Sequence, residues 1–308
     1  MTSRYKSTIR RFLSTMRPQR RPPFLLVLTI LLAHSITAVI AADQAELMKV
    51  MVSIPPQAYF VEKIGGDYVD VDIMLGPGQS PATYEPTPMQ MTNLARTQLY
   101  FRVGVPFEKQ LVEAIAGTFA QLRVVNLRES IKRDRSLTSK NQRDETDPHF
   151  WLDPNLMQSV AVTICDELIR ADSVHADRYR DNLFLLQEEL RQLDSSIAAV
   201  LAPFAGREIV VFHPAYGYFA AAYGLKQVAI EYEGKEPAAR RLVEVIEKAR
   251  TAGTKVIFVQ PQFATTSAQT VAAAIDAQLV PLDPLARDFA DNLRKMAEQI
   301  RATLAVSE

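Results

Sequence analysis

Short apolar runs alternate with amphipathic stretches along most of the chain. In the first half, the apolar runs have the length and β-branched content of strands, and the stretches between them have helical spacing. The predicted strands are Lys49–Ile54, Val69–Leu75, Gln98–Arg102 and Arg123–Asn126, and the predicted helices are Gln57–Ile64, Met89–Ala95, Pro106–Gly117 and Asn155–Ala171. This alternation predicts a mostly parallel sheet covered by helices.

A single apolar stripe occupies the middle of the chain. Its members are spaced by four and three residues in turn, which places them on one face of a helix of nearly thirty residues, about 40 Å long. They are Tyr179, Leu183, Leu186, Leu190, Leu193, Ile197 and Val200. A coiled-coil dimer would give the same stripe, but a lone helix between two α/β halves favours packing against both. We therefore expect a monomer in which Pro203 ends the helix.

The strand–helix order resumes after the long helix. The predicted strands are Glu208–Phe212, Gln227–Ile230, Val256–Val259 and Gln278–Pro281, with helices starting near Ala215, Pro237, Thr266 and Arg287. The expected fold class is α/β, with two lobes of mostly parallel sheet joined by one long rigid helix. The expected domains are an N-terminal lobe at 42–172, the linking helix at 173–203 and a C-terminal lobe at 204–308.

Two segments lack this periodicity. Residues 128–147 ("RESIKRDRSLTSKNQRDETD") are polar and charged, and we expect a solvated, mobile loop. The segment "GPGQSPATYEPTP" (76–88) follows a strand pattern and contains two Gly and four Pro, so its backbone shape is largely fixed. A rigid loop at the end of a strand suggests a binding role.

The N-terminus has the pattern of a secretory signal peptide. Seven basic residues and no acidic residue precede an apolar run, Phe24 to Ile40, which is followed by the small residues Ala41 and Ala42. This order predicts a signal peptide at 1–41, cleaved after Ala41 or Ala42. The alternative is an uncleaved anchor, although the run is near the short limit for a membrane span.

Charge and cysteine content agree with export. The 308-residue chain has 35 basic and 35 acidic residues, so removal of residues 1–41 leaves 28 against 35, a net charge of about −7. An acidic exported protein is a poor binder of nucleic acid. The one cysteine, Cys165, lies mid-chain, so the sequence offers neither an internal disulfide nor a lipid-anchor cysteine at the cleavage site. We expect a periplasmic protein.

Candidate metal ligands fall at strand ends. His213 directly follows a predicted strand, Asp283 follows another, and His149 lies between two Asp-Pro pairs in "DPHFWLDP". Ligands bind outside the carboxyl ends of parallel strands, so these three residues can face one cleft between the lobes. Two imidazoles and a carboxylate suit a divalent ion such as zinc. Taken singly, His213 is better explained as a core histidine and Asp283 as a helix N-cap; the three residues at matching positions together favour a metal.

These residues also carry a family resemblance. The mature chain resembles, over nearly its whole length, the zinc/manganese substrate-binding proteins of bacterial ABC transporters (cluster A-I). The matching stretches, in family order, are "SIPPQAYFVEKIGGDYVDV", "GPGQSPATYEPTP", "DPHFWLDP", "FHPAYGYFAAAYGL", "EGKEPAARRL" and "LDPLA". The resemblance implies His149, His213 and Asp283 as the second, third and fourth metal ligands, and an ABC permease with its ATPase as partner.

The sequence departs from the family at the first ligand. The family has a histidine in the loop before Tyr-Glu-Pro, and this chain has Ala82 there. Gln79, Glu85 or water could fill that position. The His-rich loop of many zinc members is also absent from residues 128–147. Gln260 lies at the end of another predicted strand. It is a candidate for hydrogen bonding to a residue that binds the metal, without binding the metal itself.

The leading hypothesis is a periplasmic receptor that binds a divalent metal in the interlobe cleft, zinc first and manganese second, and catalyses no reaction. One alternative is a diverged receptor of the same fold that no longer binds metal. The reason to consider it is that Ala82 stands where the family has a histidine ligand. The other is a metal-dependent hydrolase with Glu85 as base.

Overall fold

The computed structural model describes residues 47–119, 121–133, 147–231, 239–251, 253–262 and 266–306. The predicted signal peptide, its cleavage site and most of the polar segment 128–147 lie outside these residues. No helix within the described ranges is long and apolar enough to span a membrane.

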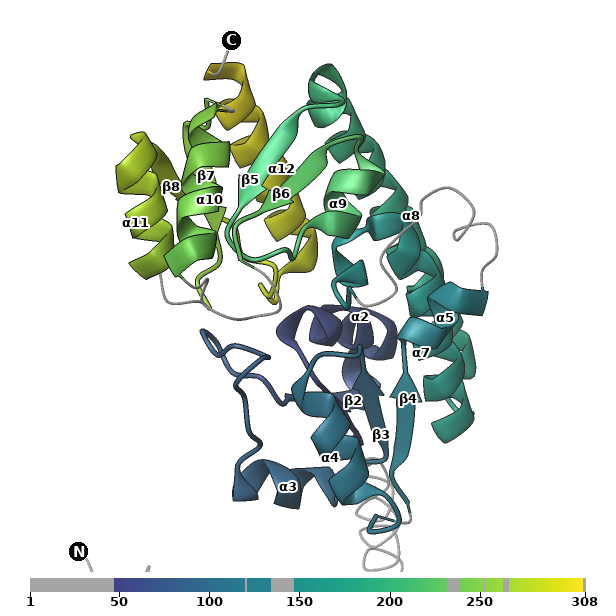
Figure 1. Ribbon diagram of the computed structural model, residues 1–308. Helices are drawn as coiled ribbons and strands as arrows, with labels where there is room; N and C mark the ends of the chain where they lie inside the picture. Colours follow the sequence, from purple (N-terminus) through teal and green to yellow (C-terminus); the bar gives the residue numbers. More distant parts are fainter. Residues whose placement is uncertain are drawn as a thin grey trace, which may run out of the picture. The chain divides into compact units, whose positions relative to one another are not determined.

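Two four-stranded parallel sheets organise the described chain (Figure 1). The sheet of the first lobe has the order β2-β1-β3-β4, and the sheet of the second lobe has the order β6-β5-β7-β8. The strands are β1 (Met48–Val52), β2 (Val69–Ile73), β3 (Leu99–Arg102), β4 (Arg123–Asn126), β5 (Glu208–Val211), β6 (Lys226–Ala229), β7 (Val256–Val259) and β8 (Gln278–Pro281). The predictions for β4, β7 and β8 match end to end, and the other strands are one or two residues shorter or shifted.

Helices connect the strands in the predicted order. They are α2 (Pro55–Gly65), α3 (Pro88–Leu94), α4 (Phe107–Ile115), α5 (Arg128–Arg133), α7 (Pro154–Ala171), α8 (Ala176–Leu201), α9 (Gly217–Ala222), α10 (Ala239–Thr251), α11 (Thr266–Ile275) and α12 (Phe289–Val306). Local sequence sets several of the starts. Asp153 caps α7 by accepting the backbone N–H of Asn155 at 2.9 Å, and Thr87 caps α3 ahead of Pro88.

The long helix α8 connects the two lobes and packs on α7, α2 and α12. It has 26 residues, and five of the seven predicted stripe residues are fully buried, while Leu183 and Val200 are partly buried. The helix ends at a short turn that contains Pro203. The predicted α/β fold with two parallel sheets and a long helix is confirmed.

A single hydrophobic cluster, here called the main core, extends through both lobes. It includes Phe60 of α2 and Leu190 of α8 as well as Phe289 and Leu293 of α12. The Phe60 and Phe289 rings meet edge to face, with centroids 4.8 Å apart. A smaller outer cluster lies in the second lobe and consists of Phe212, Ile230, Val245, Ile257, Val259, Ala268, Val271 and Ala272.

One local prediction was wrong. Residues 128–133 form helix α5 rather than loop, because the Asn126 side chain accepts the Arg128 backbone N–H at 3.2 Å and Ile131 is buried.

His175, at the start of α8, is packed and hydrogen-bonded rather than freely solvated. Its ring stacks on Tyr68 with centroids 3.8 Å apart, and its Nδ1 lies 2.6 Å from Asp172 Oδ2.

Candidate metal centre

Each strand of the second sheet is followed by a polar residue at its carboxyl end. Glu231 follows β6, His213 follows β5, Gln260 follows β7 and Asp283 follows β8. The strand order β6-β5-β7-β8 therefore lines up Glu231, His213, Gln260 and Asp283 along one edge of the sheet. His213 occupies the second place in this row, between an acid and an amide.

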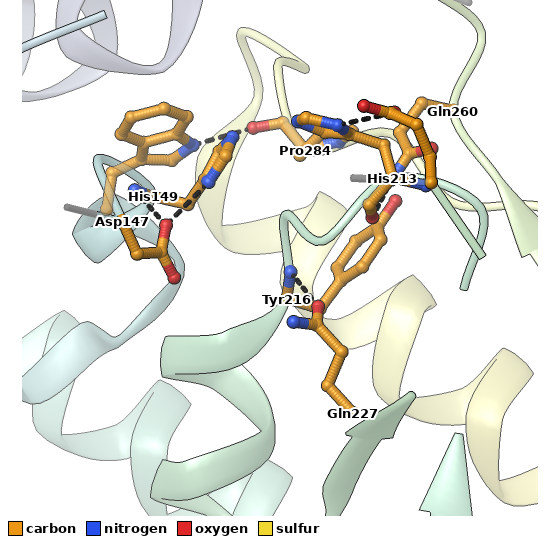
Figure 2. A network of polar contacts seen from close by, with 9 residues as sticks. Asp147, His149, His213, Tyr216, Gln227, Gln260 and Pro284 are labelled. Carbon is orange, nitrogen blue, oxygen red and sulfur yellow. Dashed lines mark hydrogen bonds and ion pairs between the residues drawn. The ribbon is translucent and has the colours of Figure 1, made fainter. Parts of the chain in front are cut away.

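His213 is held through both its backbone and its ring. Gln260 is buried and pairs with the His213 backbone, donating from Nε2 to the carbonyl at 2.9 Å and accepting the N–H at 3.3 Å (Figure 2). Nδ1 of the His213 ring lies 2.8 Å from Glu231 Oε2, and Glu231 is only 3% exposed. Gln260, which the sequence suggested as a supporting residue, thus contacts the backbone of His213, and its role around a metal stays a prediction.

His149 has a similar arrangement in the first lobe. Asp147 Oδ1 accepts the His149 backbone N–H at 2.9 Å and lies 2.6 Å from Nδ1 of the ring (Figure 2). Burial lowers the pKa of the His149 imidazole, and the hydrogen bond to Asp147 opposes part of that shift. The imidazole is therefore neutral at neutral pH, which is the form that binds metals.

The two histidines meet although 64 residues separate them in sequence. Their rings lie edge to face with centroids 5.3 Å apart, so the strand end of the second lobe faces the segment before α7 in the first. Trp151 strengthens this junction, because its Nε1–H donates to the Pro284 carbonyl at 2.8 Å and its ring centroid lies 5.1 Å from that of His149.

Asp283 stands apart from this pair. Its Oδ1 accepts the Leu285 backbone N–H at 2.9 Å and the Gln262 side-chain amide at 2.6 Å. The negative charge of Asp283 also acts on Tyr216. The pKa of Tyr216 is raised well above its ordinary value, mainly by burial and secondly by this charge. Among the residues that the structure describes, no group of three or more His, Cys, Asp or Glu is arranged to hold a metal ion. The structure thus brings His149 and His213 together and does not add Asp283 to them.

The Gly- and Pro-rich loop is fixed from within. Gln79 is exposed, and its Oε1 accepts the Gly76 backbone N–H at 2.7 Å, so this amide oxygen serves the loop itself. Gly78 has a φ of 73°, which glycine adopts without strain. Ala82 and Glu85 are both exposed. None of the three candidate positions in this loop contributes a contact to His149 or His213.

The base of the same loop is anchored in the first lobe. Tyr84 is buried against Phe107, with ring centroids 4.7 Å apart, and its hydroxyl donates to Gln90 Oε1 at 2.6 Å. Gln90 in turn donates to the Met74 carbonyl at 2.6 Å. Tyr84 therefore has a structural role in this Gly- and Pro-rich loop. Through Gln90, its side chain connects the loop to Met74, directly after β2.

Sequence reasoning missed two residues at the centre, Asp147 and Glu231. Both are carboxylates placed on the Nδ1 of a candidate ligand. Asp147 lies two residues before His149, which is a local signal that could have been used. Glu231 lies 18 residues after His213, and only the pairing of β6 with β5 reveals the contact.

Comparison with known proteins shows which family the chain belongs to. A family model described as "Zinc-uptake complex component A periplasmic" matches residues 50–303. A crystal structure of ZnuA superposes with a TM-score of 0.76 at 36% identity and covers 84% of this chain and 99% of that one. The high-affinity zinc uptake system protein ZnuA of Brucella suis is 32% identical over 171 residues, 52% of this chain and 51% of its own length. That of Paracoccus denitrificans is 26% identical over 294 residues, 83% of this chain and 89% of its own length. The chain therefore belongs to the family of periplasmic A components of zinc-uptake complexes.

Proposed function

We propose that this chain captures Zn²⁺ as cargo between its two lobes and delivers it to an ABC permease driven by an ATPase. The family match over residues 50–303 and the shared two-lobe fold support a receptor in metal uptake rather than an enzyme. The metal is transported and is not a resident cofactor, so the site has to bind it and also release it.

The observation that carries the proposal is the meeting of His149 and His213. Each ring has a carboxylate at Nδ1, which favours the proton on Nδ1 and the lone pair on Nε2. Two adjacent imidazoles with lone pairs on Nε2 are a donor pair for a divalent ion. Imidazole nitrogen favours zinc over manganese, whose preferred ligands are oxygen atoms.

The remaining donors are part of the proposal. Asp283 supplies a carboxylate oxygen from the end of β8, which lies beyond β7 from the end of β5. Gln79, Glu85 or a water molecule completes the set in place of the histidine that Ala82 replaces. Residues 1–41 act as a signal peptide that directs the chain to the periplasm, where the receptor works as a monomer.

Replacement of His213 by alanine tests the proposal. We expect wild-type protein to show a higher thermal midpoint in excess zinc than in chelator, since a ligand at ~100 times its Kd adds about 2.7 kcal/mol of stability. His213→Ala should have nearly the same midpoint in chelator and lose the zinc-induced rise. Competitive titration against a chromophoric chelator measures the affinities directly.

His175→Ala is the matched control, because this histidine packs on Tyr68 and contacts Asp172 rather than either candidate ligand. It should lower the midpoint in both conditions and keep the full zinc-induced rise. A His213→Ala protein that is unstable in chelator but retains the full rise would show that His213 is structural. Absence of zinc binding by wild-type protein would favour a diverged receptor of the same fold.

A further inference from the structure

The two candidate histidine ligands share one feature: each imidazole has its own carboxylate at Nδ1, and the two carboxylates come from different lobes. Asp147 lies 2.6 Å from His149 Nδ1, and Glu231 lies 2.8 Å from His213 Nδ1. Hydrogen bonds of this kind fix the tautomer and the ring orientation of a ligand histidine and raise its basicity.

Glu231 is buried without an evident structural reason. Its side chain is 2% exposed, and among the described residues its Oε1 has no hydrogen-bond partner. A buried carboxylate is costly unless paired, and the contact that it makes with another described side chain is the one to His213. The cost is understandable if the position of the His213 ring matters more than the stability of the fold.

Asp147 is given room by a glycine of the other lobe. A Cβ built on Gly217, the first residue of α9, would lie 2.9 Å from Asp147 Oδ2. That distance is too short for a non-bonded contact, so any larger residue would push the carboxylate aside. Gly217 does not have a positive φ, so the effect of a side chain at this position would come from its contact with the Asp147 carboxylate.

Gln260 completes the support of His213 from the opposite side, because it pairs with both backbone groups of that residue. Glu231, after β6, thus holds the ring of His213, and Gln260, after β7, holds its backbone. His149 is fixed by Asp147 through both its backbone N–H and its ring.

We propose that Asp147 and Glu231 are positioning residues that present Nε2 of His149 and His213 to the same ion. The proposal rests on the function proposed above. It also explains how the chain tolerates Ala82: with one imidazole fewer than its relatives, the site depends more on the orientation and basicity of the two that remain.

Three variants separate positioning from ligation. Glu231→Gln and Asp147→Asn keep the size of the side chain and an oxygen that can accept Nδ1–H, but remove the charge. Gly217→Ala displaces the Asp147 carboxylate without changing any residue of the site. Each variant should bind zinc about 10- to 100-fold more weakly than wild type in competitive titration. Glu231→Ala, which removes the acceptor entirely, should lose more than Glu231→Gln.

A second readout does not depend on zinc. Long-range ¹H–¹⁵N correlation spectra of the zinc-free protein report which ring nitrogen carries the proton. Wild type should show the Nδ1–H tautomer for both histidines, and Glu231→Ala should shift His213 toward Nε2–H while leaving His149 unchanged. Glu167→Gln is the control, since this buried carboxylate pairs with Arg123 instead of a histidine. It should change neither the tautomers nor the zinc affinity.

The outcomes distinguish the two proposals. If wild type binds zinc and His213→Ala abolishes binding, but the three variants bind as tightly as wild type, the positioning role is refuted and the receptor function stands. If wild type binds no zinc, the receptor function fails, and the tautomer measurement alone decides whether the carboxylates orient the rings. An Nε2–H tautomer in wild type would overturn the positioning role in either case.

Discussion

At the scale of single residues, Ala82 occupies the position at which the family resemblance leads us to expect a histidine. It is exposed in a loop whose base is anchored by Tyr84. Because the backbone there is already fixed, an added histidine would be presented without a large cost in ordering.

Restoring the histidine should strengthen the site. We expect Ala82→His to bind zinc at least ~10-fold more tightly than wild type, because a third imidazole replaces a weaker donor or water. Competitive titration gives the ratio. Thr83→His, at the next exposed position, is the control and should leave the affinity near that of wild type. Equal affinities for Ala82→His and wild type would mean that another group already fills this position.

His149 should also make the zinc-free protein sensitive to acid. Its pKa is lowered in the folded state by burial, so the unfolded chain binds its proton more readily. The resulting loss of stability begins as the pH falls through the ordinary histidine value of about 6.5 and is complete below the folded-state pKa, at ~1.4 kcal/mol per unit of pKa depression.

Urea unfolding at pH 7.5 and at pH 5.5, with chelator present, measures this effect. The stability lost between the two pH values should be smaller in His149→Gln than in wild type. Equal losses in the two proteins would mean that the His149 pKa does not change on folding.

At the scale of elements, the apolar stripe of α8 is the face of the helix that is buried. Leu190 is fully buried on the stripe, whereas Leu185, on the same helix, is 65% exposed. Leu190→Ala should cost about 2–5 kcal/mol through lost burial and the cavity left behind. Leu185→Ala should change stability by less than ~0.5 kcal/mol. Equilibrium unfolding in urea compares them, and similar losses would contradict the one-sided burial of this helix.

The same element explains what could be predicted from sequence. In α8 and in the strands, apolar residues recur at a regular spacing over several residues, so the spacing predicts the type of element. Helix α5 is six residues long and mostly polar, and it depends on a cap from Asn126, so no period reveals it. His213 could be proposed from its place at a strand end, and His149 from the Asp-Pro pairs on either side of it. Glu231 could not, because its importance arises only when β6 pairs with β5.

At the scale of the whole described chain, Trp151 connects the lobes next to the candidate site. It is the one tryptophan in the sequence, and its indole donates to the Pro284 carbonyl, one residue after Asp283. Zinc bound by His149 and Asp283 would approach both ends of this link. We expect zinc to change the emission of Trp151, and His149→Ala to abolish the change. A flat emission during a titration in which calorimetry detects binding would argue against His149 as a ligand.

The continuity of the main core has a consequence for how the molecule comes apart. Because Phe60 of the first lobe and Phe289 of the second belong to one hydrophobic cluster around α8, neither lobe can lose its packing without exposing apolar surface of the other. The lobes should therefore melt together, in one cooperative transition whose calorimetric and van't Hoff enthalpies agree. Two resolved heat-absorption peaks would contradict this. The two lobes therefore behave as one folding unit, and a destabilising change in either lobe would lower the abundance of the whole receptor.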